Sequence, residues 1–171
     1  TVEVTSKVGE GTMVRLKLPL TLAVIETLIV ESNERQFAIP LDAIKETVQT
    51  TKSSIKTLKG REAMEIRGEI LGITPLAELL NLEDVVKGEN QELDEVKEET
   101  EDEKVSIVVL EVNGQEVGLS VDHLYSQQEI VIKPLEEYLA NIPGLKGSTI
   151  MGDGQIVLIL EHNELMEMAT S

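Results

Sequence analysis

One feature of the sequence constrains the fold more than any other: the chain repeats itself. At an offset of 80 residues a run of positions recurs in the same order: Glu31 with Glu111, Asn33 with Asn113, Phe37 with Val117, Ala38 with Gly118, Ile39 with Leu119, Leu41 with Val121, Asp42 with Asp122 and Ile44 with Leu124. At an offset of 86, Gly68 falls on Gly154 and Leu79 on Leu165. The alternative explanation for these matches is that all small β units share hydrophobic alternation. The paired Glu, Asn, Asp and Gly favour a duplicated unit of about 60 residues.

Each copy carries the signals of short antiparallel strands. In the first copy, Leu28–Val30 and Phe37–Ile39 flank a polar turn, and Ile66–Ile70 contains a second turn at Arg-Gly-Glu. In the second copy, Val105–Val112 leads into Asn113-Gly114, the strongest short hairpin signal, because both residues tolerate positive φ. The repeated unit is therefore predicted to be a small β unit of four or five strands.

A sheet of that size must close or pack against another layer to bury its apolar face. We predict an all-β protein with minor α content, in which two small barrels lie side by side. Short helices are expected at Pro75–Leu80, Pro134–Ala140 and Asn163–Ala169. Because the chain has one Phe, two Tyr and no Trp, its core must be built from Val, Ile and Leu.

An acidic stretch separates the two copies. From Glu83 to Lys104, eleven acidic residues stand against three lysines, a net charge of −8 within a chain total of −17. Charge blocks that lack an apolar face are typical of solvated linkers, so residues 83–104 are predicted to be a linker or a long surface loop. A cation site is the alternative, but a Ca²⁺ loop needs a fixed order of ligands around a turn-forming Gly, and the stretch has no such pattern.

The composition argues against several classes of protein. A net charge of −17 opposes binding to nucleic acid and to anionic lipid. The best candidate for a membrane span, Leu22–Val30, is interrupted by Glu26 and is far shorter than the roughly 18 residues that a span needs. No signal peptide is visible, and the absence of cysteine favours a reducing compartment. We therefore expect a cytoplasmic protein without membrane insertion, and the start at Thr1 indicates a piece of a longer chain.

The sequence contains no convincing catalytic constellation. His123 stands where the first copy has Ala43, which indicates a surface or packing role. His162 begins a short box that faintly resembles a phosphoacceptor site, but phosphoacceptor histidines of that kind lie on long paired helices. Asp153 lies between two glycines, which is typical of a hairpin turn. No Walker-type loop or nucleophile elbow occurs, so we predict no enzymatic activity, no cofactor and no metal.

The order of motifs along the chain is distinctive. Gly9-x-Gly11-Thr12 precedes Val14-Arg-Leu-Lys-Leu-Pro-Leu-Thr-Leu-Ala23, which begins with strand-like alternation. Later come Phe37-Ala-Ile-Pro-Leu41, Ile66-Arg-Gly-Glu-Ile70 and Gly147-Ser-Thr-Ile-Met-Gly-Asp-Gly154. This arrangement resembles the bacterial chemotaxis histidine kinase CheA, at the junction where the ATP-binding domain passes into the C-terminal CheW-like regulatory domain. The resemblance covers nearly the whole chain apart from the acidic stretch.

The resemblance implies a fold of two SH3-like five-stranded β-barrels and a division of the chain into four parts. Residues 1–20 would be the last strand of the ATP-binding domain and the junction. Residues 21–82 would form the first barrel, residues 83–104 the acidic linker, and residues 105–171 the second barrel with a C-terminal helix.

The resemblance also implies a function: a non-catalytic regulatory and scaffolding domain that docks on the CheW adaptor and on the cytoplasmic tips of chemoreceptors. The parent chain would be an ATP-dependent protein histidine kinase, dimeric through a domain outside this chain. A free CheW-type adaptor is the main alternative, opposed by the kinase-like strand at the start. The missing ATP-binding motifs argue against the hypothesis that the chain is a catalytic fragment of a kinase. A nucleic-acid-binding barrel is opposed by the charge and by the lack of an aromatic stacking set.

One residue pair carries over from the adaptor family, in which a Glu after the Ile-Pro-Leu type strand pairs with the Arg of the Arg-Gly turn. In this sequence the two positions are Glu46 and Arg67, and the second copy has Ser126 and Asp153 there. Docking also needs an exposed apolar patch. The candidates for that patch, each of which equally suits the core, are Ile39, Leu41, Ile44 and Val48.

Overall fold

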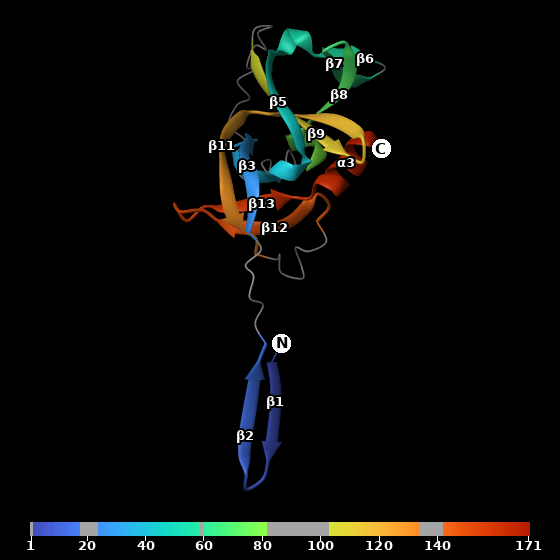
Figure 1. The fold of residues 1–171 in the computed structure, drawn as a ribbon. Coiled ribbons are helices and arrows are strands. Elements are labelled where there is room, and N and C mark those ends of the chain that lie inside the picture. The colour runs from blue at the N-terminus through green and yellow to red at the C-terminus, as the bar shows by residue number, and fades with distance from the viewer. Residues whose placement is uncertain (1, 18–23, 59, 82–102, 134–141) are drawn as a thin grey trace, which may run out of the picture.

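The structure, a computed structural model, describes residues 2–17, 24–58, 60–81, 103–133 and 142–171 (Figure 1). Its strands are β1 (Val2–Lys7), β2 (Gly11–Leu16), β3 (Val24–Ser32), β4 (Arg35–Pro40), β5 (Ile44–Thr51), β6 (Lys56–Leu58), β7 (Arg61–Ile66), β8 (Glu69–Pro75), β9 (Lys104–Val112), β10 (Gln115–Val121), β11 (His123–Val131), β12 (Leu145–Ile150) and β13 (Ile156–Leu160). Its helices are the 3₁₀ turns η1 (Leu41–Ala43) and η2 (Lys52–Ser54) and the α-helices α1 (Leu76–Leu79) and α3 (His162–Thr170). The predicted mostly-β fold with short helices is therefore confirmed.

The strands form three sheets. β1 and β2 pair as an antiparallel hairpin. A six-stranded sheet has the order β5-β9-β10-β8-β7-β6, and a five-stranded sheet has the order β11-β3-β4-β13-β12. Lys133, just beyond β11, bonds through its backbone N–H and C=O to Ser148 of β12, at N···O distances of 2.8 and 3.0 Å. The two outer strands of the five-stranded sheet therefore meet at this point.

The duplication predicted from the sequence is visible in the order of elements. An offset of 80 carries β3, β4 and β5 onto β9, β10 and β11. An offset of 86 carries β7, β8 and α1 onto β12, β13 and the start of α3. The Asn113-Gly114 turn has φ values of 53° and 78°, as expected for a two-residue hairpin turn of this composition.

The two larger sheets cross the sequence boundary that we predicted between the two barrels. β11 of the second copy pairs with β3 of the first, and β5 of the first pairs with β9 of the second. β13 runs parallel to β4, and β8 runs parallel to β10. Each of the two larger sheets therefore combines strands of both copies. The first hairpin of each copy, β3–β4 or β9–β10, would by itself have two unpaired edges. This exchange of strands between the copies supplies hydrogen-bond partners for the backbone groups on both edges.

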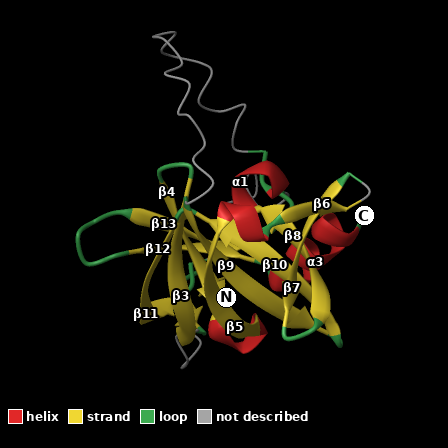
Figure 2. Cartoon of the chain, turned by 90° about the horizontal axis from the view of Figure 1, so that it is seen from above, coloured by secondary structure: helices red, strands yellow, loops and turns green. Residues whose placement is uncertain are grey.

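The main core lies where the two copies meet. Val30, Phe37 and Ile39 of the first copy pack in one cluster with Val108 and Leu119 of the second. The cluster also includes Leu76 of α1 and Leu165 of α3, both fully buried. Both helices contact β10 (Figure 2), and α1 also contacts β8, whereas α3 also contacts β9. Because one core serves both copies, neither copy buries its apolar face alone.

The predicted helix after Pro75 and the predicted C-terminal helix are confirmed as α1 and α3. The helix predicted at Pro134–Ala140 and most of the acidic stretch lie outside the described residues. None of the helices in the described ranges has the length and apolar character needed to cross a membrane.

The β1–β2 hairpin is exposed along its whole length (Figure 1). Its register places Val2 opposite Leu16 and Val4 opposite Val14, so these four side chains share one face. A single hairpin is marginally stable in water. The hairpin therefore presents an exposed apolar face.

Candidate docking site

A cleft of about 500 Å³ opens at one end of the six-stranded sheet. Three segments border it: the beginning of β5, the turn between β7 and β8, and the turn between β9 and β10. Its lining mixes charged and apolar side chains, namely Lys45, Glu46, Ile66, Arg67, Glu69, Ile70, Leu71, Val109, Gly114 and Glu116. This cleft contains both members of the predicted ion pair.

The turn between β7 and β8 holds Arg67 in an unusual conformation. Ile66 pairs with Glu69, so only Arg67 and Gly68 form the turn. Both have positive φ, 54° and 87°, as a tight hairpin turn requires. Glycine adopts this region freely, but for arginine it costs on the order of 1 kcal/mol. The fold therefore holds an arginine at the tip of a hairpin despite its conformational preference.

The predicted contact between Glu46 and Arg67 is present. Arg67 Nη2 donates to Glu46 Oε2 at 2.7 Å. The Arg67 side chain is 77% exposed and that of Glu46 is 24% exposed. A pair this accessible contributes only about 0–1 kcal/mol to stability. Its effect is to fix the direction of an otherwise long and mobile guanidinium group.

A β-bulge explains why two consecutive residues of β5 both line the cleft. The register against β9 shifts between Ile44 and Glu46, and a bulge of this kind redirects side chains that would otherwise point to opposite faces. The second copy has a shift at the corresponding place, between Leu124 and Gln127 of β11. The bulge is thus part of the repeated unit.

Lys45 forms a second charged contact in the cleft. Its Nζ donates to Glu116 Oε1 and lies 3.6 Å from Glu111 Oε2. The hydrogen bond to Glu116, together with the negative charges of both glutamates, raises the pKa of Lys45 above its ordinary value. No local sequence pattern indicates this cluster. The three residues lie on β5, β9 and β10, and the pairing of β5 with β9 follows from the strand exchange.

Ile70 stands at the mouth of the cleft with 72% of its surface exposed. Its neighbour Leu71 is buried, and so is Ile73, so β8 alternates and Ile70 faces outward. Ile70 was not among the docking residues predicted from the sequence. The alternation with Leu71 and Ile73 was the signal that identifies it as the exposed apolar residue of this site.

The four apolar residues proposed for docking do not form an exposed patch. Ile39 is fully buried in the main core. Of the two roles considered for it, docking and core packing, it therefore has the second. Leu41 and Ile44 are half-buried and pack against the same cluster. Val48 packs against a smaller cluster within the six-stranded sheet. Each of the four therefore contributes to one of the apolar clusters inside the protein.

The corresponding end of the five-stranded sheet has a similar shape and different chemistry. A cleft of about 430 Å³ is lined there by residues that include Glu31, Gln36 and Ile156. Tyr125, the counterpart of Lys45, donates from its hydroxyl to Glu31 Oε2 at 2.6 Å. This hydrogen bond raises the pKa of Tyr125 above its ordinary value. Ile156, the counterpart of Ile70, is 70% exposed.

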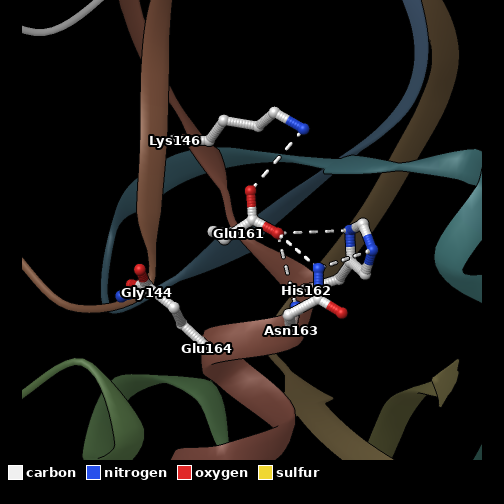
Figure 3. A network of polar contacts seen from close by, with 6 residues as sticks. All are labelled: Gly144, Lys146, Glu161, His162, Asn163 and Glu164. Carbon is white, nitrogen blue, oxygen red and sulfur yellow. Dashed lines mark hydrogen bonds and ion pairs between the residues drawn. The ribbon is translucent and has the colours of Figure 1, made fainter. Parts of the chain in front are cut away.

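The polar network around the start of α3 is structural (Figure 3). The Glu161 carboxylate accepts a bond from Asn163 Nδ2 at 3.0 Å and lies 3.6 Å from Lys146 Nζ. Burial would raise the pKa of Glu161, but the bonds from Asn163 and the Lys146 charge outweigh it and lower that pKa. His162 Nδ1 is buried without a hydrogen-bond partner, 3.8 Å from Glu161 Oε1. The described part of the chain contains no group of His, Cys, Asp and Glu suited to a metal ion.

Comparison with known proteins adds an independent line of evidence. A family model described as "CheW-like domain" matches residues 26–170. The sensor histidine kinase CheAY of Helicobacter pylori is 39% identical over 170 residues, which cover 99% of this chain and 20% of that protein. The chemotaxis protein CheA of Klebsiella aerogenes is 36% identical over 96% of this chain and 23% of its own length. The chain thus spans about a fifth of the length of these curated relatives.

A solved structure is similar in fold. The crystal structure of the scaffolding protein CheW from Thermoanaerobacter tengcongensis matches with a TM-score of 0.57 and 18% sequence identity. The match covers 80% of this chain and 88% of that one.

Proposed function

Because the chain belongs to the CheW-like domain family, as its sequence resemblance predicted, we propose that it is the regulatory and scaffolding domain of a chemotaxis histidine kinase. In this role it docks on a CheW-type adaptor and on the cytoplasmic tips of chemoreceptors, at the cytoplasmic face of a receptor array. Support comes from its curated relatives, which are CheA proteins matched over about a fifth of their length.

The observation that carries the proposal is the exposed Ile70 beside an arginine held in place by Glu46. Exposed apolar residues rimmed by ordered polar groups mark protein interfaces. Arginine is enriched at the centres of such interfaces, because its planar group offers five N–H donors. The contact with Glu46 uses Nη2, and the Arg67 side chain is 77% exposed, so its other donors are accessible to a partner. The end of the six-stranded sheet is therefore our candidate for the adaptor-binding surface.

The test is a calorimetric titration of the chain with a CheW-type adaptor, comparing Ile70→Asp with Ile156→Asp. Both isoleucines are about equally exposed and occupy corresponding positions, so the two variants perturb folding to a similar extent. We expect Ile70→Asp and Arg67→Glu each to weaken binding at least about tenfold, as for a central interface residue. Ile156→Asp should leave the affinity within about twofold.

Two results would count against this assignment. Equal weakening by both isoleucine variants would remove the preference for the six-stranded sheet. Absence of saturable binding by the unaltered, folded chain would remove the docking proposal itself.

The β1–β2 hairpin favours a kinase-derived domain over a free adaptor, the second candidate. The residues of its apolar face, Val2, Val4, Val14 and Leu16, are 58–64% exposed, as expected of the last strands of an ATP-binding domain separated from that domain. We propose no catalytic step for this chain, because the sequence contains no other ATP motif. Saturable ATP binding by the isolated chain, measured by equilibrium dialysis, would contradict this.

A further inference from the structure

A basic segment stands out in this acidic protein. Between residues 50 and 61 the sequence has four cationic side chains and no carboxylate, although the whole chain has 32 acidic and only 15 basic residues. The described cations of this segment are Lys52 in η2, Lys56 in β6 and Arg61 at the start of β7. This segment is separate from the cleft around Arg67 and Ile70.

The basic segment includes an outer strand of the six-stranded sheet. β6 is last in the strand order, and its three residues are exposed. Its described pairing is with β7 alone, and it lies at the rim of the molecule in both views (Figures 1 and 2). Leu58, at the end of β6, is 49% exposed. An outer strand of this kind presents backbone donors and acceptors to a further strand.

The register shows which backbone groups face outward. Leu58 pairs with Arg61 across a two-residue connection, and Thr57 pairs with Glu62. The pair that closes a two-residue hairpin is hydrogen-bonded, so the next pair is not. The N–H and C=O of Thr57 therefore point away from β7, toward the open edge.

The side chains give this edge its charge. Lys56 and Leu58 lie on the same face of the hairpin as Arg61, and Glu62 lies on the opposite face. Arg61 Nη2 donates to the Ser171 carbonyl oxygen at 2.8 Å, which fixes the guanidinium group at this rim. Two cations and one exposed leucine therefore line a strand edge with an outward-pointing peptide group.

We propose that the open edge of β6 is a docking site for an extended acidic segment of a partner protein. The segment adds to the sheet as a further strand and bonds to the peptide groups of Thr57. Its carboxylates face Lys56 and Arg61, and an apolar residue contacts Leu58. Strand addition of this kind takes affinity from main-chain bonds and specificity from alternate side chains, and the charge match selects acidic partners.

The test uses the fluorescent seven-residue peptide Glu-Thr-Val-Thr-Glu-Thr-Val, whose Glu and Val side chains share one face of an extended strand. Its anisotropy is measured as the chain is added. A peptide with Gln in place of every Glu is the control for charge. We expect saturable binding of the Glu peptide that weakens as salt is raised from 50 to about 200 mM, because the contacts are exposed to solvent. The Gln peptide should bind at least about tenfold more weakly.

Variants then locate the site. Lys56→Glu should weaken binding about tenfold or more, whereas Lys133→Glu, the same charge change at an exposed lysine of the five-stranded sheet, should change it less than about twofold. Thr57→Pro removes the outward N–H without removing a bond to β7, and should also weaken binding. Circular dichroism checks that each variant is folded.

Three results would overturn the proposal. One is absence of binding by the Glu peptide, which would leave Lys56 as a residue that only protects the edge from pairing. A second is equal weakening by Lys56→Glu and Lys133→Glu, which would mean a general charge effect. A third is binding that appears only after residues 84–101 are deleted, which would make the chain's own acidic stretch the occupant.

Discussion

The two ends of the duplicated fold share a backbone and differ in their side chains. Each end combines a bulged strand, a hairpin tip and an exposed isoleucine. Six charged residues surround the end of the six-stranded sheet: Lys45, Glu46, Arg67, Glu69, Glu111 and Glu116. Their counterparts at offsets of 80 and 86 are Tyr125, Ser126, Asp153, Gln155, Glu31 and Gln36, of which only Asp153 and Glu31 are charged at neutral pH.

The two ends therefore share the backbone shape that the repeat determines, whereas the side chains available to contact a partner differ between them. The bulge and the hairpin are needed to close the strands around a shared core, so both copies retain them. The side chains on the rim contribute little to stability, so they are free to change. A partner that distinguishes the two ends must therefore respond to charge and hydrogen bonding, because the apolar tip is common to both.

The largest expected effect tests whether the two copies contribute equally to the core. Ile39 and Leu119 occupy corresponding positions and are both fully buried. Ile39→Ala and Leu119→Ala should each lower the free energy of unfolding by about 2–5 kcal/mol, because each leaves a cavity in the shared core. Urea denaturation measures this. If either variant lowers the free energy of unfolding by less than about 1 kcal/mol, the copy that contains that residue contributes less to the stability of the core than the other copy.

A smaller effect is expected where the copies differ inside the core. Gly118 is the counterpart of Ala38, and an added Cβ at Gly118 would lie 2.4 Å from Ile73 Cδ1 and 3.0 Å from Ile107 Cγ2. Gly118→Ala should therefore cost about 1–3 kcal/mol through overpacking, because the isoleucine methyls must move. Ala38→Gly, the reciprocal change, should cost about 1 kcal/mol through lost contacts and added chain entropy. Thermal denaturation of the two variants tests the pair, and a stabilised Gly118→Ala would contradict it.

The helices that end the two repeats should differ in their response to pH. Pro75 precedes α1 and provides no side-chain cap, whereas its counterpart Glu161 caps α3. The pKa of Glu161 is lower in the folded chain than its ordinary value of 4.5. The charged form therefore adds stability above pH 4.5, and this stability is lost as the pH falls through the lower folded value.

Glu161→Gln should accordingly reduce stability at pH 7 by up to about 1 kcal/mol, the scale of a helix cap. The difference from the unaltered chain should shrink toward zero in acid, as measured by urea denaturation at several pH values. A difference that stays constant below pH 4 would show that charge is not the cause.

The smallest expected effect concerns the ion pair that only one end has. A double-mutant cycle with Glu46→Gln and Arg67→Gln should give a coupling of at most about 1 kcal/mol, because the pair is accessible to solvent. The same variants should weaken adaptor binding more than they lower stability. A coupling above about 2 kcal/mol would mean that the pair stabilises the fold. The difference between the two ends would then be a difference in stability and not in partner recognition.

The sequence predicted the parts of the fold that depend on local patterns. The Asn113-Gly114 turn, the strands on either side of it and the helix after Pro75 follow from backbone preferences of neighbouring residues. The contact between Glu46 and Arg67 came from the family resemblance. The strand exchange was not predictable in this way, because β5 pairs equally well in principle with either copy of a repeated strand.

The composition of the site was predicted less well than the fold. Ile39 and Ile70 are both isoleucines on strands, yet Ile39 is buried and Ile70 faces solvent. For Ile70, the alternation with Leu71 and Ile73 was sufficient. For Lys45 and Glu116, which are far apart in the sequence, the ion pair depends on β5 lying next to β9, and the sequence does not contain that information locally.

The exchange of strands also has a mechanical consequence. β3 begins at Val24, at the N-terminal end of the described body, and is bonded on one side to β4 and on the other to β11. A force applied along β3 from its N-terminal end therefore loads both rows of hydrogen bonds in shear, so many bonds must break together. One of these rows joins β3 to β11, which belongs to the opposite copy. Tension on the N-terminal connection is thus shared by both repeats at once, and the body resists pulling as a single unit.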